Sequence, residues 1–129
     1  MRSLLILIVL STATVINCIT IRVSHNGLLD ATAIQQAIDM SVSEDTILVY
    51  PGRYVENINY IGKNIVITSL VTATGNIAYR DSTIIDGNQN GPCVFLYNGE
   101  YNTSIIGFTI TNGNGFLHSS QNRELKYSL

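Results

Sequence analysis

This 129-residue chain has little of several features that would indicate other classes of protein. Only 12% of its residues are charged, and its seven Lys and Arg residues are scattered, so no basic patch indicates nucleic-acid binding. Ile, Val, Thr, Asn and Gly are frequent instead, which is typical of a β-rich globular domain rather than a helical bundle. We expect one domain at most and no nucleic-acid partner.

The chain also lacks an apolar run of the ~20 residues that a transmembrane helix needs. Its start, MRSLLILIVLSTATVINC, has one positive charge at Arg2, an apolar run over 4–10, and small or polar residues after that run. This three-part pattern predicts a secretory signal peptide over residues 1–18. We therefore expect a secreted or cell-surface protein without a transmembrane segment in its mature chain.

Cysteine is scarce, with Cys18 and Cys93 as the only two. Because Cys18 lies at the predicted cleavage site, no intrachain disulfide is expected. The residues before it, VIN, match a lipobox only loosely, so lipid attachment at Cys18 is the less favoured alternative to cleavage. Neither cysteine has metal-ligand spacing, and we expect neither a metal nor a cofactor.

One segment has helical periodicity. Apolar residues spaced three and four apart share a face over 33–41, and Thr32 with Gln35 gives the Thr-x-x-Gln pattern of a capping box. This pattern predicts a short amphipathic helix over 33–41, which follows a linker or first strand at 19–30.

From residue 46 onward the periodicity changes from 3.6 to 2. Apolar segments bounded by Gly, Asn, Pro or Asp predict strands at 46–50, 64–68, 82–86, 93–97 and 104–111. No second helical pattern separates them, which excludes repeated βαβ units. Alternation assigns the inward side chains, which are Ile47, Val49, Ile65, Ile67, Ile84, Val94, Leu96, Ile106, Phe108 and Ile110.

Several of these segments repeat one phrase, a branched aliphatic strand closed by a polar turn. The copies TILVYPG, NIVITS, STIIDGN and GFTITNGNG recur at an uneven spacing of roughly 20 residues. Such repetition favours a parallel solenoid over the alternative, an antiparallel β-sandwich. We expect an all-β fold of about three rungs, with the helix covering the first rung because an open strand edge invites strand addition.

These phrases carry a resemblance to a known family. TAIQQAIDMSVSEDTILVYPGRYVENINYIGKNIVITS resembles the opening of right-handed parallel β-helix proteins of the pectin lyase-like superfamily, and STIIDGNQNG and GFTITNGNG resemble later rungs of secreted bacterial β-helix repeat proteins. The resemblance implies a capped right-handed β-helix over 31–115. Residues 116–129 contain no rung phrase, so we expect an irregular tail and a truncated protein.

Catalysis is not predicted. In the resembling pectinesterases and lyases the acids, amides and Arg that act on pectin project from central rungs that this sequence does not reach. Asp81 and Asp86 flank one strand as candidate calcium ligands or acids, but DGN is also an ordinary turn. His25 and His118 lie outside the repeats, with no nucleophile and acid at usable spacing.

Carbohydrate contact is the remaining site hypothesis. Tyrosine rings can stack on sugars, with ordinary packing as the alternative, and Glu56 could contact a sugar or simply be solvated. The candidates are Tyr54, Glu56, Tyr97 and Tyr101. Asn102 begins the sequon NTS, which is a glycosylation acceptor only in a host that glycosylates.

Three functions are consistent with these patterns. The favoured one is a secreted or surface β-helix module without its own catalysis, which serves structure, adhesion or carbohydrate binding. The alternatives are a remnant of a pectin- or polysaccharide-active enzyme that lacks its catalytic rungs, and a β-sandwich binding domain. An uncapped last rung also predicts self-association through the C-terminal end.

Overall fold

The computed structural model describes residues 17–115, which form mostly parallel strands with three short helices. The predicted signal peptide (1–18) lies almost entirely outside the described residues, and the predicted tail (116–129) lies wholly outside them. The helices are α1 (Ile34–Met40), α2 (Leu70–Thr74) and α3 (Ala78–Ser82). The strands are β1 (Thr20–Val23), β2 (Thr46–Val49), β3 (Gly52–Val55), β4 (Ile58–Asn59), β5 (Val66–Ser69), β6 (Thr83–Asp86), β7 (Val94–Phe95), β8 (Ser104–Ile106) and β9 (Thr109–Thr111).

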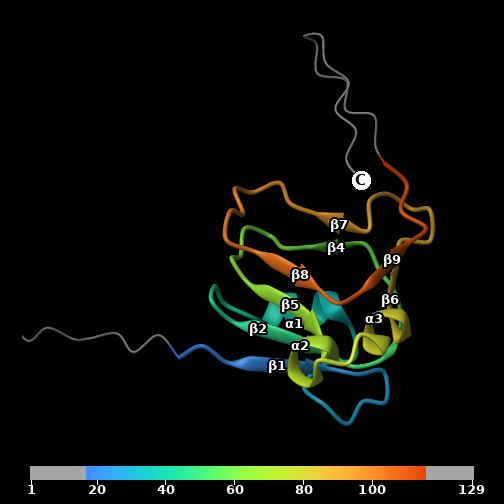
Figure 1. Cartoon of the computed structure of the whole chain (residues 1–129). Coiled ribbons are helices and arrows are strands. Elements are labelled where there is room, and N and C mark those ends of the chain that lie inside the picture. The colour runs from blue at the N-terminus through green and yellow to red at the C-terminus, as the bar shows by residue number, and fades with distance from the viewer. Residues whose placement is uncertain (1–16, 116–129) are drawn as a thin grey trace, which may run out of the picture.

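The strands belong to three sheets (Figure 1). Sheet A has the order β1-β2-β5-β8, sheet B the order β3-β6-β9, and sheet C contains β4 and β7. The chain visits the sheets in the order A, B, C and then returns to A, so β2-β3-β4 form a first circuit, β5-β6-β7 a second, and β8-β9 begin a third. All strand pairings between described residues are parallel. The parallel prediction is confirmed and the antiparallel sandwich is wrong.

Side chains in register form the core. In sheet A, Ile47 lies opposite Ile21 on one side and Ile67 on the other, and Ile67 lies opposite Ile105. Ile47 and Ile67 are fully buried, as are Ile58 in sheet C and Ile85 in sheet B. Each buried aliphatic side chain of this size stabilises the fold by about 1.5–3 kcal/mol. The predicted inward positions Ile47, Val49, Ile65 and Ile67 are therefore confirmed.

Two inward predictions are wrong by one residue. Ile85 is buried instead of Ile84, because Ile85 lies opposite the buried Tyr54 in the register of β3 and β6 and successive strand residues face opposite sides. Ile106 is 40% exposed, whereas its neighbour Ile105 packs against the core.

Two more residues predicted to point inward, Ile110 and Leu96, are about half exposed among the described residues. Ile110 lies opposite Ile85 and so has the inward register, yet it is 47% exposed because it belongs to the last described strand. Leu96 is 52% exposed and follows β7, the last described strand of sheet C. Val94 and Phe108 are partly buried against the core.

The predicted strand 104–111 is two strands in different sheets. Gly107, with φ of +78°, turns the chain between β8 and β9, and a Cβ at this position would collide with Ser69. Apolar and polar residues continue to alternate in the sequence across this corner, so the pattern did not indicate the change of sheet. The strands β3 and β4 were not predicted, because their segment, GRYVENIN, is largely polar. Strand β1 lies in the segment predicted as a linker or first strand.

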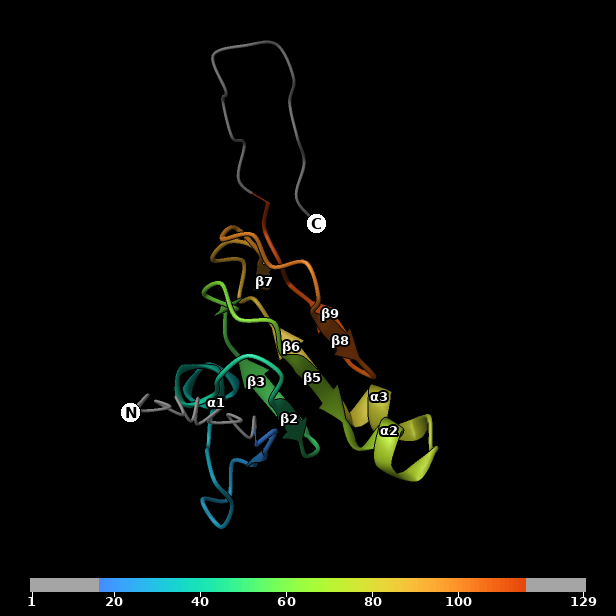
Figure 2. The same cartoon turned by 90° about the vertical axis from the view of Figure 1, so that its left-hand side faces the viewer.

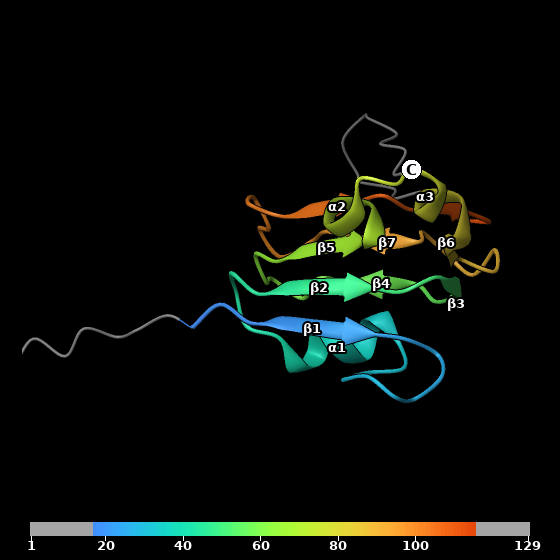
Figure 3. The same cartoon turned by 60° about the horizontal axis from the view of Figure 1, so that its bottom comes forward.

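The helix predicted at 33–41 is α1, which lies at the β1 end of the stack and packs against β1, β2 and β4 (Figure 3). Its predicted capping box is wrong. The N-cap is Ala33, which has no side-chain hydrogen bond, while the backbone N–H of Thr32 donates to Gln36 Oε1 at 3.1 Å.

Helices α2 and α3 were not predicted. They lie together between β5 and β6, beyond the end of β5 (Figure 2). Neither buries a residue, so neither has the amphipathic period by which a helix is found in a sequence. Within residues 17–115, none of the helices is both long enough and apolar enough to cross a membrane.

Candidate functional site

Tyr54 is fully buried and so is not a carbohydrate contact, contrary to the prediction. Its ring stacks on His25, with 4.1 Å between the ring centroids, and its hydroxyl donates to the carbonyl oxygen of Tyr50 at 2.9 Å. Burial, and next the charge of Glu56, raises the pKa of Tyr54 to about 12. Tyr54 is a core residue because it occupies the inward register opposite Ile85.

Glu56 holds the start of α1. Its two carboxylate oxygens accept hydrogen bonds from the backbone N–H groups of Ile34, at 2.9 Å, and Gln35, at 3.0 Å. These are the N–H groups that a helix leaves without an intrahelical partner, and a negative charge there is also favoured by the helix dipole. Glu56 is therefore occupied in the structure and is not available to a sugar. No local pattern indicates this role, since the helix lies some 20 residues earlier in the chain.

Lys63, which the sequence did not single out, holds the other end of the same helix. Its ammonium group donates to the carbonyl oxygens of Ile38, at 2.5 Å, and Asp39, at 3.0 Å. A cation at the C-terminal end of a helix complements the dipole, and here the ammonium group adds to the hydrogen bonds that Ser41 donates to the Ile38 carbonyl. Both ends of α1 are thus fixed by charged residues of the first circuit and the turn that follows it.

Tyr97 and Tyr101 are exposed, at 62% and 87%. They belong to the loop 96–103 between β7 and β8, which we call the aromatic loop. The ring of Tyr97 lies 5.6 Å from that of Phe95, centroid to centroid, and the backbone N–H of Tyr101 donates to Asn64 Oδ1 at 3.4 Å. Of the four predicted contact residues, these two tyrosines are the ones that solvent reaches freely.

Glu100 fixes the aromatic loop against the preceding circuit. Its carboxylate accepts hydrogen bonds from the backbone N–H of Gly62 and from that of Asn98, each at 2.8 Å. Burial opposes ionisation, but the hydrogen bonds from the N–H groups of Gly62, Glu100 and Asn98 outweigh it and lower the pKa of the Glu100 carboxyl. At neutral pH the carboxylate is therefore charged and the loop is tied to the turn at Gly62.

A hollow of about 970 Å³ lies beside the aromatic loop, at the end of the stack formed by the last described strands. Its walls are mostly apolar and carry no charged side chain. We call it the C-terminal hollow. The lining residues are Pro92 to Tyr97, Ile105, Ile110 to Gly113, and Gly115.

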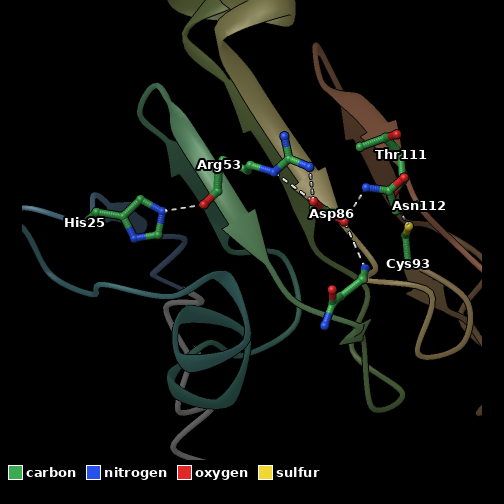
Figure 4. A network of polar contacts seen from close by, with 7 residues as sticks. His25, Arg53, Asp86, Cys93, Thr111 and Asn112 are labelled. Atoms are coloured by element: carbon green, nitrogen blue, oxygen red, sulfur yellow. Dashed lines mark hydrogen bonds and ion pairs between the residues drawn. The ribbon is translucent and has the colours of Figure 1, made fainter.

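Asp86, the last residue of β6, is the centre of a polar network that connects β3, β6 and the turn after β9 (Figure 4). Arg53 donates to its Oδ2 from Nε, at 2.7 Å, and also from Nη2. Its Oδ1 accepts from the backbone N–H of Asn88, at 2.9 Å, and from Asn112 Nδ2, at 3.0 Å. Asp86 is 5% exposed, whereas the Arg53 side chain is 56% exposed.

These partners explain the ionisation of Asp86. The N–H of Asn88 and the amide of Asn112 lower the pKa of the Asp86 carboxyl below its usual value against the effect of burial, and Arg53 lowers it further. A carboxylate with all these hydrogen bonds is held in place and has no open position for a substrate or a cation. The arrangement fits a structural role that links successive strands of sheet B.

The remaining candidates do not come together. Asp81 pairs with Arg80 at 3.1 Å, and both are exposed on α3. The Nε2 atom of His25 lies 3.0 Å from the carbonyl oxygen of Arg53, and His118 lies outside the described residues. In the part of the chain that the structure describes, no three His, Cys, Asp or Glu side chains form a group that could hold a metal ion.

Comparisons with known proteins do not identify the chain. No family model, no curated protein and no solved structure matches it.

Proposed function

We propose that this chain is a non-catalytic, secreted or surface module built as a right-handed parallel β-helix of the pectin lyase-like type, and that its aromatic loop binds polysaccharide. The order in which the chain visits sheets A, B and C supports the β-helix, because successive circuits stack in register. Right-handed crossings are favoured because about 98% of parallel β-crossovers have that hand.

The observation that carries the carbohydrate proposal is the exposure of two tyrosines on a loop that is fixed in position. Large exposed aromatic side chains gain free energy when a ligand covers them, and a tyrosine offers a flat ring with a polar hydroxyl. The amides of Asn98 and Asn102, both exposed on the same loop, can donate to sugar hydroxyl groups. Because Glu100 fixes the loop, little conformational entropy is lost on binding.

The absence of catalysis is proposed from the state of the acids. General acid–base catalysis needs a carboxyl group within hydrogen-bond reach of the substrate. Asp86 is buried among its protein partners, and the carboxylate of Glu56 accepts hydrogen bonds from α1. The acid and the arginine of α3, Asp81 and Arg80, pair with each other.

Affinity electrophoresis through gels that contain polygalacturonate, methylated pectin, xylan or a neutral glucan tests the binding. We expect retardation by at least one of these polymers. Replacing both Tyr97 and Tyr101 by Ala should weaken that retardation by about tenfold, since truncating a binding anchor costs more than about 1 kcal/mol. The matched control is Ile77→Ala, which removes a 63% exposed apolar side chain elsewhere. Retardation that the double variant leaves unchanged would contradict the role of the aromatic loop.

A release assay on polygalacturonate and methylated pectin, with and without Ca²⁺, tests the absence of catalysis. We expect no product above the level of a buffer control. Reproducible turnover that disappears in the Asp86→Ala variant would instead establish the polysaccharide-active enzyme, provided that circular dichroism shows the variant to be folded.

A further inference from the structure

Half of the ten glycines in this chain directly follow an asparagine. In such a pair the backbone nitrogen of the glycine can attack the side-chain carbonyl carbon of the asparagine, because the glycine has no Cβ to hinder the approach. Forming a turn is one role of an Asn-Gly pair, and this reaction is another. The five pairs are Asn26-Gly27, Asn90-Gly91, Asn98-Gly99, Asn112-Gly113 and Asn114-Gly115.

The pair at Asn112 is fixed by hydrogen bonds on both its side chain and its main chain. Its Nδ2 donates to Asp86 Oδ1 at 3.0 Å, and its carbonyl oxygen accepts from the backbone N–H of Gln89 at 2.7 Å. That carbonyl belongs to the same peptide group as the nitrogen of Gly113, which would have to attack. Both hydrogen bonds therefore oppose the rotations that bring the reacting atoms together.

The pair at Asn26 is restrained in a similar way. The side-chain oxygen of Asn26 accepts from the backbone N–H of Leu28 at 3.1 Å. The N–H of Gly27, the group that must lose its proton, donates to the carbonyl oxygen of Ser24 at 3.4 Å. Both hydrogen bonds must break before the attack.

The pair at Asn90 is restrained by burial of its glycine. Gly91 is buried, and its carbonyl oxygen accepts from the N–H of Asn114 at 2.8 Å and from Asn57 Nδ2 at 3.3 Å. Its nitrogen cannot move far without disturbing these contacts. The pair Asn114-Gly115 borders residues that the structure does not describe, so the comparison concerns the other four pairs.

The pair at Asn98 lies on the aromatic loop and has none of these restraints. Asn98 and Gly99 are both exposed, and apart from the chain neighbours no heavy atom lies within 4 Å of the place that a Cβ of Gly99 would take. Among residues 17–115, neither the side-chain amide of Asn98 nor the N–H of Gly99 has a hydrogen-bond partner. The N–H of Asn98 does donate to Glu100, but it precedes the bonds that rotate in the attack.

We propose that Asn98 is a modification site, at which the chain deamidates itself in water and so loosens the tie between the aromatic loop and the turn at Gly62. The backbone nitrogen of Gly99 bonds to the side-chain carbonyl carbon of Asn98 and gives up its proton. The bond from that carbon to Nδ2 breaks, and the amide nitrogen leaves with this proton as ammonia. One water molecule then opens the cyclic imide to give aspartate or isoaspartate at position 98. Nothing is oxidised or reduced, and water is the only co-reactant.

Either product places a new carboxylate beside Glu100. The Glu100 carboxylate now accepts hydrogen bonds from the N–H groups of Gly62 and Asn98, each at 2.8 Å. Two neighbouring carboxylates repel each other. Isoaspartate also lengthens the main chain by one methylene group, which displaces Glu100 from its donors. Glu100 should therefore hold the N–H of Gly62 less firmly after the reaction.

This reaction requires neither carbohydrate binding nor the absence of catalysis. A negative result in the polysaccharide experiment therefore leaves it intact, and its own failure leaves the proposed binding by Tyr97 and Tyr101 intact.

The experiment compares the folded full chain with the same chain unfolded in guanidinium chloride, both kept at mildly alkaline pH. Chymotrypsin, which cleaves after Tyr97 and Tyr101, releases residues 98–101 as one peptide. Mass spectrometry then measures the loss of amide in this peptide and in those of the other pairs, after a short digestion at mildly acidic pH that keeps further loss small.

We expect Asn98 to react about as fast in the folded chain as in the unfolded chain. Asn112 should react slower by about tenfold or more when the chain is folded, because a hydrogen bond to a charged group is strong enough to change a rate by that factor. Asn26 and Asn90 should also be slower in the folded chain than in the unfolded chain.

Three variants test the site and its consequence. Asn98→Gln should stop the reaction at this position, because a side chain one methylene longer closes the ring far more slowly. The matched control is Asn102→Gln, at an exposed asparagine of the same loop that Thr103 follows, which should leave the reaction at Asn98 unchanged. Asn98→Asp supplies the carboxylate at once and should speed amide hydrogen exchange at Gly62 by about fivefold, the factor that repulsion between two unit charges at close range produces in water.

Each other outcome overturns a part of the proposal. If Asn98 is slowed by folding as much as Asn112, the loop protects it and the site is wrong. Faster loss at Asn26 or Asn90 than at Asn98 in the folded chain would overturn the choice of pair. Complete conversion at position 98 with unchanged hydrogen exchange at Gly62 would contradict the loosening of the loop.

Discussion

The two ends of the strand stack are covered by different structural features. At the N-terminal end, α1 covers the first circuit, Glu56 and Lys63 hold the two ends of that helix, and Arg22 pairs with Asp30 at 3.1 Å beside β1. At the C-terminal end, the described residues leave Leu96 and Ile110 about half exposed around an uncharged hollow.

The difference shows that the end strands of a parallel stack need interactions that the middle strands do not need. Strands in the middle are specified by their neighbours, because each buried side chain packs on equivalent side chains above and below. A terminal layer has a neighbour on one side only and needs a different cover. At the N-terminal end that cover is placed by charged side chains that meet the orphan N–H and C=O groups of a helix.

The largest expected effect contrasts the middle of the stack with its C-terminal end. Ile67→Ala should lower the free energy of unfolding by about 2–5 kcal/mol, because it leaves a cavity at a fully buried site. Ile110→Ala, at a position 47% exposed, should cost less than half as much. Urea unfolding followed by circular dichroism measures both. Equal losses would mean that the two layers are equally covered.

A second prediction tests the hydrogen bonds that Asp86 makes across sheet B. Because the folded state lowers the pKa of this carboxyl, its ionised form contributes stability that is present above the ordinary pKa of about 4 and is lost as the pH falls through the lower, folded value. Asp86→Asn should therefore reduce the acid sensitivity of the fold below about pH 4. Thermal unfolding between neutral and strongly acidic pH measures it, and an unchanged acid limb in the variant would argue against the network.

A third prediction tests the cover of the N-terminal end. Glu56→Ala should cost about 0.5–2 kcal/mol, the usual range for losing a helix cap, because the N–H groups of Ile34 and Gln35 lose their acceptors. Amide hydrogen exchange should show faster exchange in α1 and little change in β8 and β9. Lys63→Ala is the companion variant at the other end of α1. Uniform acceleration across all three sheets would show that the helix and the stack unfold together.

The smallest effect at neutral pH is expected for Tyr54→Phe, which removes one hydrogen bond worth about 1 kcal/mol. Burial raises the pKa of Tyr54 to about 12 and also raises that of Tyr60. Since the folded state keeps both phenols neutral, their contribution is complete below about pH 10 and is lost as the pH rises toward 12 and beyond. Tyr54→Phe should reduce this alkaline loss. Urea unfolding at neutral and alkaline pH, with phenolate absorbance as a second readout, tests it.

The sequence predicted α1, the parallel pairing and the inward side chains of β2 and of the segment that leads into β5, because these depend on alternation within a segment and on similarity between segments. It failed where a side chain's surroundings come from another layer. Ile84 and Ile85 are adjacent residues of the same type, and only the register with β3 decides that Ile85 is buried. The corner at Gly107 interrupts no alternation, and so it was read as part of one strand.

The candidate site divides in the same way. Tyr54, Tyr97 and Tyr101 are the same residue type, and all three lie at or near strand ends. Tyr54 has an inward register and a histidine against its ring, whereas the other two lie on a loop that projects from the stack. Glu56 was a candidate for sugar contact, with a solvated side chain as the alternative, but its partners are the first N–H groups of a helix that is distant in sequence. Residue type suggested the candidates, and long-range contacts decided between them.

The purely parallel pairing of the strands has a consequence for the rate of folding. Hairpins allow an antiparallel sheet to start from neighbouring residues, but here the partners Thr46 and Val66 are 20 residues apart, and Val66 and Ser104 are 38 apart. The chain must close these long loops before any hydrogen bonds between strands form, and the entropy cost of closure grows with loop length. Proteins dominated by such distant contacts fold in milliseconds to seconds rather than microseconds. Newly made copies of this protein therefore spend an extended time with unpaired strands, during which folding competes with aggregation.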